Sequence, residues 1–170
     1  MKKILLTFSV LIFFSCKTDE EKAKEKRIKD SITAVVMNDF NDGFQESLIE
    51  RNFNNDEIRK APVKVVSCEF VQDSMSTSKH IELFFKNVSK KNIIAVRFKW
   101  YGENVYGEPA DAGGLNGFGG GSSENFVKPN EEVAVTWDIY SKNGKTIKGC
   151  RPEVVVFEDG SKWELKNLIN

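Results

Sequence analysis

The chain is predicted to be mainly β, with an antiparallel β-sandwich over residues 62–170. Three observations predict this fold. Apolar and polar residues alternate along several segments after Pro62, turn residues separate those segments, and no helical period falls between them. Such alternation is expected of strands with one buried and one hydrated face. Strands joined only by turns favour an antiparallel arrangement.

The alternation is clearest in residues 79–86 (KHIELFFK), 94–101 and 133–140. Residues 63–72 form an earlier strand, and the turn EDGS at 158–161 is a hairpin signal. The side chains predicted to face the core are Ile81, Leu83, Phe85, Ile94, Val96, Phe98, Trp100, Val133, Val135, Trp137 and Ile139.

Residues 20–49 have a helical pattern. Their apolar residues recur at helical spacing and form one stripe on a charged cylinder. The segment NDFNDG at 38–43 carries break signals, and residues 51–60 (RNFNNDEIRK) are expected to be a linker. We therefore interpret residues 16–61 as a helical stalk and linker before the sandwich. The stripe consists of Ile28, Ile32, Val35, Val36 and Phe40.

The N-terminus reads MKKILLTFSVLIFFSC. Two lysines precede an apolar run that is shorter than the about 20 residues needed to span a bilayer, as in a signal peptide. Ser15–Cys16, followed by a polar segment, resembles the lipobox of bacterial lipoproteins. The resemblance implies that residues 1–15 are removed as a signal peptide and that Cys16 is acylated, which anchors the chain to a membrane. An ordinary signal peptide with an unrelated cysteine is the alternative.

The residues after Cys16 bear on the destination. Lys17 stands where an inner-membrane retention signal of such lipoproteins would place Asp, which favours the outer membrane. Asp19, Glu20 and Glu21 resemble the acidic patch that directs some lipoproteins to the cell surface. We expect an envelope location, on the periplasmic or the surface face.

Composition bears on the class of function. The formal net charge is zero, so no basic footprint for nucleic acid is expected. His80 is the single histidine, and no acids cluster at ligand spacing, so we expect no metal site and no cofactor. No nucleophile stands in a context that pairs it with a base, and we therefore expect a protein that is not an enzyme.

Residues 86–109 (KNVSKKNIIAVRFKWYGENVYGEP) resemble the small immunoglobulin-like domains of bacterial envelope proteins that carry an FxLYD motif. The motif would fall on Phe98, Trp100, Tyr101 and Gly102. The resemblance implies an immunoglobulin-like sandwich and no activity, because function must be argued from a site.

Residues 107–126 (GEPADAGGLNGFGGGSSENF) are rich in glycine but lack the spacing of a phosphate-binding loop. We interpret them as a slack loop between strands, which should tolerate shortening. The alternative is a recognition loop with Leu115, Phe118 and Phe126 as apolar contacts.

Cys68 and Cys150 remain after Cys16 is acylated. In an oxidising envelope they could form a disulfide, and two separate buried thiols are the alternative. The sequence as a whole predicts a lipid-anchored, non-catalytic interaction module for a protein or glycan partner. A small-ligand or glycan binder that uses the glycine-rich loop, with Trp100, Trp137 or Tyr101 as a stacking surface, is the second hypothesis.

Overall fold

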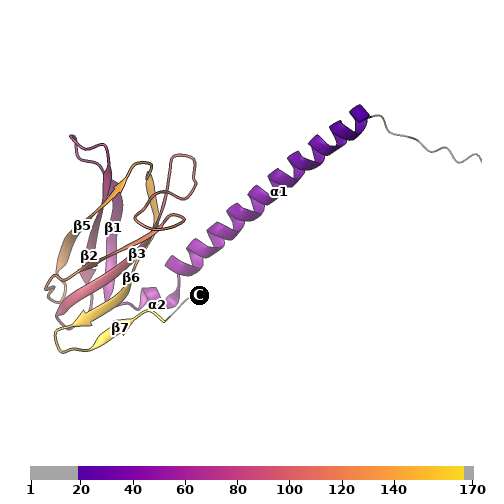
Figure 1. The fold of residues 1–170 in the computed structure, drawn as a ribbon. Helices are drawn as coiled ribbons and strands as arrows, with labels where there is room; N and C mark the ends of the chain where they lie inside the picture. The colour runs from indigo at the N-terminus through magenta and orange to yellow at the C-terminus, as the bar shows by residue number, and fades with distance from the viewer. Residues whose placement is uncertain (1–18, 167–170) are drawn as a thin grey trace, which may run out of the picture. The chain divides into compact units, whose positions relative to one another are not determined.

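The computed structural model describes residues 19–166 (Figure 1). The chain divides into two compact units, Met1–Phe44 and Gln45–Asn170. The seven strands of the described residues all belong to the second unit. The predicted signal peptide and Cys16 lie outside the described residues.

The first unit contains most of helix α1 (Asp19–Phe53). The break predicted at residues 38–43 is wrong, because the helix continues through this segment. A glycine such as Gly43 costs a helix only about 1 kcal/mol relative to alanine, which is too little to interrupt a helix of 35 residues. Ile28 and Ile32 of the predicted stripe are exposed.

The second unit begins with the last turns of α1 and with α2 (Asp56–Arg59). The segment 51–60, predicted to be a linker, is therefore largely helical. Asn55 begins α2 as its N-cap, because its side-chain Oδ1 accepts a hydrogen bond from the Ile58 amide at 2.9 Å. Phe53 lies against the outer face of the sandwich, stacked on Phe118 with 6.3 Å between ring centroids.

Two antiparallel sheets follow, and they confirm the predicted β-sandwich. One sheet has the strand order β1-β2-β5 and the other β4-β3-β6-β7. Seven strands in two such sheets are the architecture of immunoglobulin-like domains. The strands are β1 (Val63–Val71), β2 (Lys79–Asn87), β3 (Ile93–Glu103), β4 (Phe118–Ser123), β5 (Glu132–Ser141), β6 (Thr146–Phe157) and β7 (Lys162–Glu164).

The core lies between the sheets and contains the predicted inward residues of β2 and, apart from Ile94, those of β3. Phe85 and Phe98 are fully buried, and their ring centroids are 5.1 Å apart. Trp100 is also fully buried and packs against Trp137 of β5 at 5.2 Å. Aromatic pairs at such distances add to the free energy gained by burial.

A bulge corrects one detail of the predicted pattern, and a second bulge alters the facing of residues in β1. Ile94 is exposed and its neighbour Ile93 is buried, because the β3–β6 register shifts between Ile93 and Ala95. A second shift between Val65 and Ser67 leaves Val66 exposed. A bulge inserts one residue, so the alternation resumes out of phase with the sequence before it.

The glycine-rich segment is not slack, and this prediction is wrong. Its second half forms β4, which pairs with β3 from Tyr101↔Phe118 to Val96↔Ser123. Two of its glycines are needed because tryptophan rings lie against them: a Cβ would be 2.3 Å from Trp100 Nε1 at Gly119 and 2.4 Å from Trp137 Cε2 at Gly121. Shortening this segment would remove an edge strand of the second sheet.

Candidate interaction surface

Three connections meet at one end of the sandwich, which we call the apical end. They join β1 to β2 (residues 72–78), β3 to β4 (104–117) and β5 to β6 (142–145). Consecutive strands run in opposite directions, so these alternate connections lie together, at the top of the sandwich in Figure 1. The chain enters β1 at the opposite, basal end.

Large apolar side chains are exposed on these connections and at the end of β5. Their exposed fractions run from 69 % for Val105 to 99 % for Met75. Single exposed apolar residues are normal, whereas several at the same end of a domain make that end a candidate interaction surface. We call the group the apical cluster: Met75, Val105, Tyr106, Leu115 and Tyr140.

Asp111 ties the β3–β4 connection to the β5–β6 turn. Its carboxylate accepts hydrogen bonds from Ser141 Oγ at 2.6 Å, from the Lys142 amide at 2.8 Å and from the Asn143 amide at 3.2 Å. Partial burial raises the pKa of Asp111, but these hydrogen bonds outweigh it and hold the pKa below its ordinary value. The carboxylate form therefore fixes the two connections together.

The β1–β2 connection is joined to the same turn. Lys79 Nζ, at the start of β2, donates a hydrogen bond to the Gly144 carbonyl. The ring of Phe70 lies against two glycines nearby. A Cβ added at Gly144 would be 2.5 Å from this ring, and a Cβ added at Gly102 would be 2.7 Å from it. The motif position predicted at Gly102 thus holds glycine because Phe70 occupies the space of a side chain.

The tip that carries Val105 and Tyr106 is also internally bonded. Asn104 Oδ1 accepts hydrogen bonds from the Tyr106 amide at 2.8 Å and from the Glu108 amide at 3.1 Å. Side chains of Asn commonly stabilise turns in this way. Together these contacts present the apical cluster on connections that are held in place.

Tyr140 has an unusual backbone. Its φ is 53°, in the left-handed region that is a genuine outlier for a bulky residue. Lys79 pairs with Ser141 and Ile81 with Trp137, so β5 contains additional residues before Ser141. This bulge turns Ser141 inward toward Asp111 and leaves the Tyr140 side chain exposed. Strained residues of this kind concentrate at functional sites.

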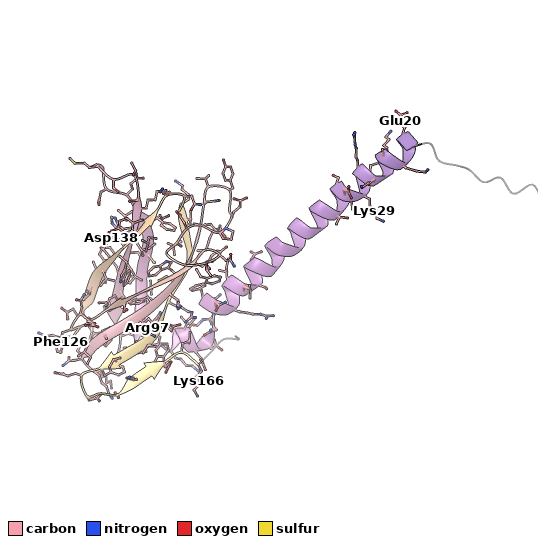
Figure 2. All side chains as sticks on the ribbon, viewed as in Figure 1. Glu20, Lys29, Arg97, Phe126, Asp138 and Lys166 are labelled. Carbon is pink, nitrogen blue, oxygen red and sulfur yellow. The ribbon has the colours of Figure 1, made fainter. Side chains whose placement is uncertain are left out.

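The three predicted recognition residues do not form one surface. Leu115 is exposed at the apical end, whereas Phe126 lies beyond the other end of β4, near the base of the sandwich (Figure 2). Phe118 lies between Phe53 and Tyr101, with 5.0 Å between the centroids of its ring and that of Tyr101. Only Leu115 joins the apical cluster.

The aromatic residues considered as a stacking surface are used for packing. Trp100 and Tyr101 are buried, and Trp100 Nε1 donates to the Ala112 carbonyl at 2.7 Å. Trp137 is half-buried, and its indole donates to the Ser122 carbonyl at 3.0 Å. The glycine-rich segment therefore offers none of these rings to a ligand.

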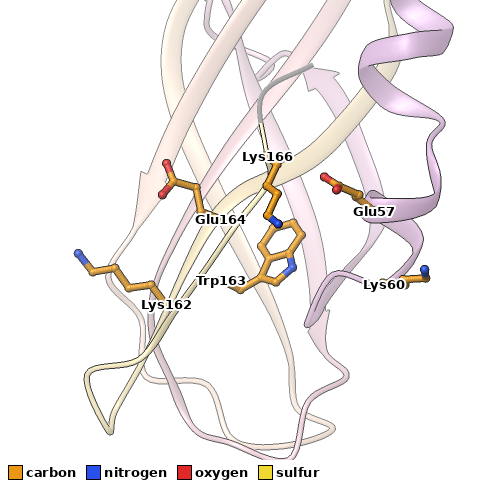
Figure 3. Close-up of a pocket in the computed structure, with 6 residues that line it drawn as sticks. All are labelled: Glu57, Lys60, Lys162, Trp163, Glu164 and Lys166. Atoms are coloured by element: carbon orange, nitrogen blue, oxygen red, sulfur yellow. The ribbon is translucent and has the colours of Figure 1, made fainter. Parts of the chain in front are cut away.

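A shallow hollow of about 320 Å³ lies at the basal end, between α2 and β7 (Figure 3). The half-buried indole of Trp163 is surrounded there by side chains of both charges. Because the charged side chains around the ring have both signs, the hollow favours neither an anionic nor a cationic ligand. The other lining residues are Glu57, Lys60, Lys162, Glu164 and Lys166.

No three His, Cys, Asp or Glu side chains gather within residues 19–166 in a way that could hold a metal ion. His80 Nδ1 lies 3.9 Å from an Asp73 carboxylate oxygen, on the β1–β2 connection. No helix among the same residues is long and apolar enough to cross a membrane.

The structure brings Cys68 and Cys150 together, although they come from different sheets. Both are free, half-buried thiols that pack against the core, and Cys68 lies near enough to Cys150 to act on its thiol. Burial, followed by this contact with Cys68, raises the pKa of the Cys150 thiol well above its ordinary value.

The members of the apical cluster other than Leu115 were not singled out from the sequence. Tyr140 did carry a signal, because it falls on the polar face of an alternating segment. Met75, Val105 and Tyr106 stand in segments without a period, where the sequence does not separate exposed from packed residues.

Neither a family model nor a curated protein sequence matches this chain. Among solved structures it is similar to a hypothetical protein of Peptoclostridium difficile 630, with 11 % identity and a TM-score of 0.47, over 62 % of this chain and 87 % of that one. It is also similar to the trimeric lipoprotein SadB of Salmonella enterica, with 14 % identity and a TM-score of 0.33, over 82 % and 84 % of the two chains. Neither likeness carries an argument about function. The resemblance to FxLYD domains is not confirmed beyond the sandwich fold.

Proposed function

We propose that this chain is a lipid-anchored protein of the bacterial envelope, with its β-sandwich as a non-catalytic interaction module. The N-terminal sequence supports the anchor, because a short apolar run ends at Ser15–Cys16. Two or three acyl chains on Cys16 would hold a folded domain at a membrane, where a single chain would not. Lys17 favours the outer membrane as the destination.

The apical cluster is the observation that carries the interaction. Its side chains stand on connections that are hydrogen-bonded to each other, so a partner would not have to order them on binding. A partner that covered these side chains would remove apolar surface from water, and each Å² buried would stabilise the complex by about 25 cal/mol. The strained backbone of Tyr140 supports the same reading, because it presents a large side chain that the core does not use.

The kind of partner follows from how far these side chains project. Groups that are 69 to 99 % exposed stand out from the surface and do not enclose a small molecule. Aromatic and Met side chains are enriched where proteins contact each other. We therefore propose a protein partner with an apolar surface rather than a small ligand or a glycan.

Photo-crosslinking in intact cells tests this proposal. A photoreactive residue replaces Tyr106 in the full chain, and the control carries it at Lys90, an exposed position on the basal β2–β3 turn. We expect a discrete protein adduct from position 106 only. The change Met75→Ser with Leu115→Ser should reduce its yield about 5-fold or more, the equivalent of about 1 kcal/mol of binding. Equal adducts from both positions would contradict the proposal.

A further inference from the structure

Cys68 and Cys150 are positioned by independent features of two strands. In β1, the bulge between Val65 and Ser67 turns Cys68 toward the core. In β6, Cys150 lies directly opposite the buried Trp100 of β3. Directly paired residues of antiparallel strands share a face, so Cys150 points between the sheets as Trp100 does.

The two thiols are therefore neighbours across the interior of the sandwich. Strands β1 and β6 belong to different sheets and lie in contact with each other, and both cysteines pack against the same hydrophobic core, with Cys68 near enough to act on the Cys150 thiol. A disulfide needs side chains that point toward each other from backbones a few ångströms apart. Two strands of opposite sheets rarely offer such a pair by chance, because only inward positions at the same height qualify.

We infer that Cys68 and Cys150 form a disulfide that links the two sheets. The oxidant is a disulfide of another thiol compound, such as glutathione disulfide or a disulfide-exchanging oxidoreductase. One cysteine thiolate attacks that disulfide, which releases one carrier thiolate and forms a mixed disulfide. The second cysteine thiolate then attacks the chain sulfur and displaces the other carrier thiolate. Two electrons pass to the carrier, and the protons of the two cysteine thiols end on the carrier thiolates or on solvent.

The burial of the pair determines when the bond can form. Exchange needs a thiolate that an oxidant can reach. In the closed sandwich the raised pKa keeps Cys150 protonated, and the half-buried position of both residues against the core restricts access to their sulfur atoms. The bond therefore forms while the sheets are still apart and is sealed when they close, and a folded, reduced chain is oxidised slowly.

Refolding of the purified full chain in detergent tests the inference. The chain is unfolded in guanidinium chloride with a reductant and refolded in a buffer of reduced and oxidised glutathione. It is then quenched with acid, alkylated and mapped as peptides. We expect one linked peptide pair, Cys68 with Cys150, and a Tm about 10 °C or more above that of the chain refolded with reductant. A folded, reduced sample in the same buffer should form the bond at least about 10-fold more slowly.

The variant Cys68→Ala with Cys150→Ala is the matched control. Its Tm should be the same in the two buffers. Alkylation of both cysteines after refolding with glutathione would overturn the inference. So would a redox-dependent Tm that persists in the double variant. Because the test is made with purified protein, its failure is distinct from a failure of the proposed anchor or of the proposed partner.

Discussion

The indole of Trp137 lies directly against the backbone of Gly121, so that a Cβ on Gly121 would be only 2.4 Å from Trp137 Cε2. The two residues stand on β5 and β4, which are edge strands of different sheets. The indole Nε1 also donates to the carbonyl of Ser122, next to that glycine. The contact closes one side of the sandwich, and glycine is the residue that permits it.

The change Gly121→Ala should therefore lower the free energy of unfolding by about 1–3 kcal/mol, as overpacking does elsewhere. Denaturant melts would measure it. Gly43→Ala is the control and should not destabilise the chain, because nothing lies within 4 Å of a Cβ at that position and alanine favours a helix over glycine by about 1 kcal/mol. If both variants unfolded at the wild-type midpoint, the close contact between Gly121 and Trp137 would be refuted.

Phe98 and Lys99 test the assignment of faces within one strand. Phe98 is fully buried against Phe85 and Trp137, whereas Lys99 is exposed. Phe98→Ala should cost about 3–5 kcal/mol, and Lys99→Ala should stay within about 0.5 kcal/mol. Denaturant melts of the two variants measure these losses in the free energy of unfolding. Comparable losses would mean that β3 is turned the other way.

Tyr140→Gly should stabilise the domain while weakening the interaction. Glycine adopts a φ of 53° freely, so the change should raise the free energy of unfolding by about 0.5–1 kcal/mol. Tyr106→Gly is the control and should lower stability, because Tyr106 is also largely exposed but has no positive φ. Denaturant melts measure the stability of both variants. For Tyr140→Gly, the yield of the crosslink from position 106 also measures the interaction. A Tyr140→Gly protein that melts earlier than the wild type would argue against backbone strain.

Asp111 should make the apical connections sensitive to acid. Because its pKa is lowered in the folded state, its carboxylate stabilises the fold fully above the ordinary value of about 3.8, and this stability is lost as the pH falls below that value. The Tm of the wild type should therefore drop more between about pH 5 and pH 2.5 than that of Asp111→Asn. Asp159, whose pKa the hydrogen bond from Lys91 also lowers, is present in both proteins and cancels in the comparison. Equal drops would show that Asp111 does not hold these connections.

Cys16→Ala should release the chain from membranes or stop its maturation, because the proposed anchoring depends on acyl chains at this residue. Partition of the full chain between detergent and aqueous phases measures the effect. Lys17→Ala serves as the control and should remain in the detergent phase. Unchanged partition of Cys16→Ala would remove the lipid anchor from the proposed function.

The sequence alone determined the sandwich and most of its core. Strict alternation in residues 79–86 marks Ile81, Leu83 and Phe85 as inward, and the structure agrees because an uninterrupted strand keeps its period of two. The turn before β7 was also predicted from the sequence by its Asp-Gly pair, and the structure agrees, since Gly160 has a φ of 78°. Local patterns of this kind need no knowledge of the partner strand.

The positions of the bulges, the role of the β4 glycines and the pairing of distant residues were decided only by the tertiary structure, because these features depend on which residue of another strand lies opposite. The bulge near Val66 arises in the pairing of β1 with β2 and leaves no trace in the period of one strand. From the sequence Gly119 and Gly121 of β4 were interpreted as part of a slack loop, yet the rings of Trp100 and Trp137, which come from other strands, lie against them. The same holds for the neighbouring thiols of Cys68 and Cys150 and for the apical cluster, since each is assembled from segments that meet only when the two sheets close.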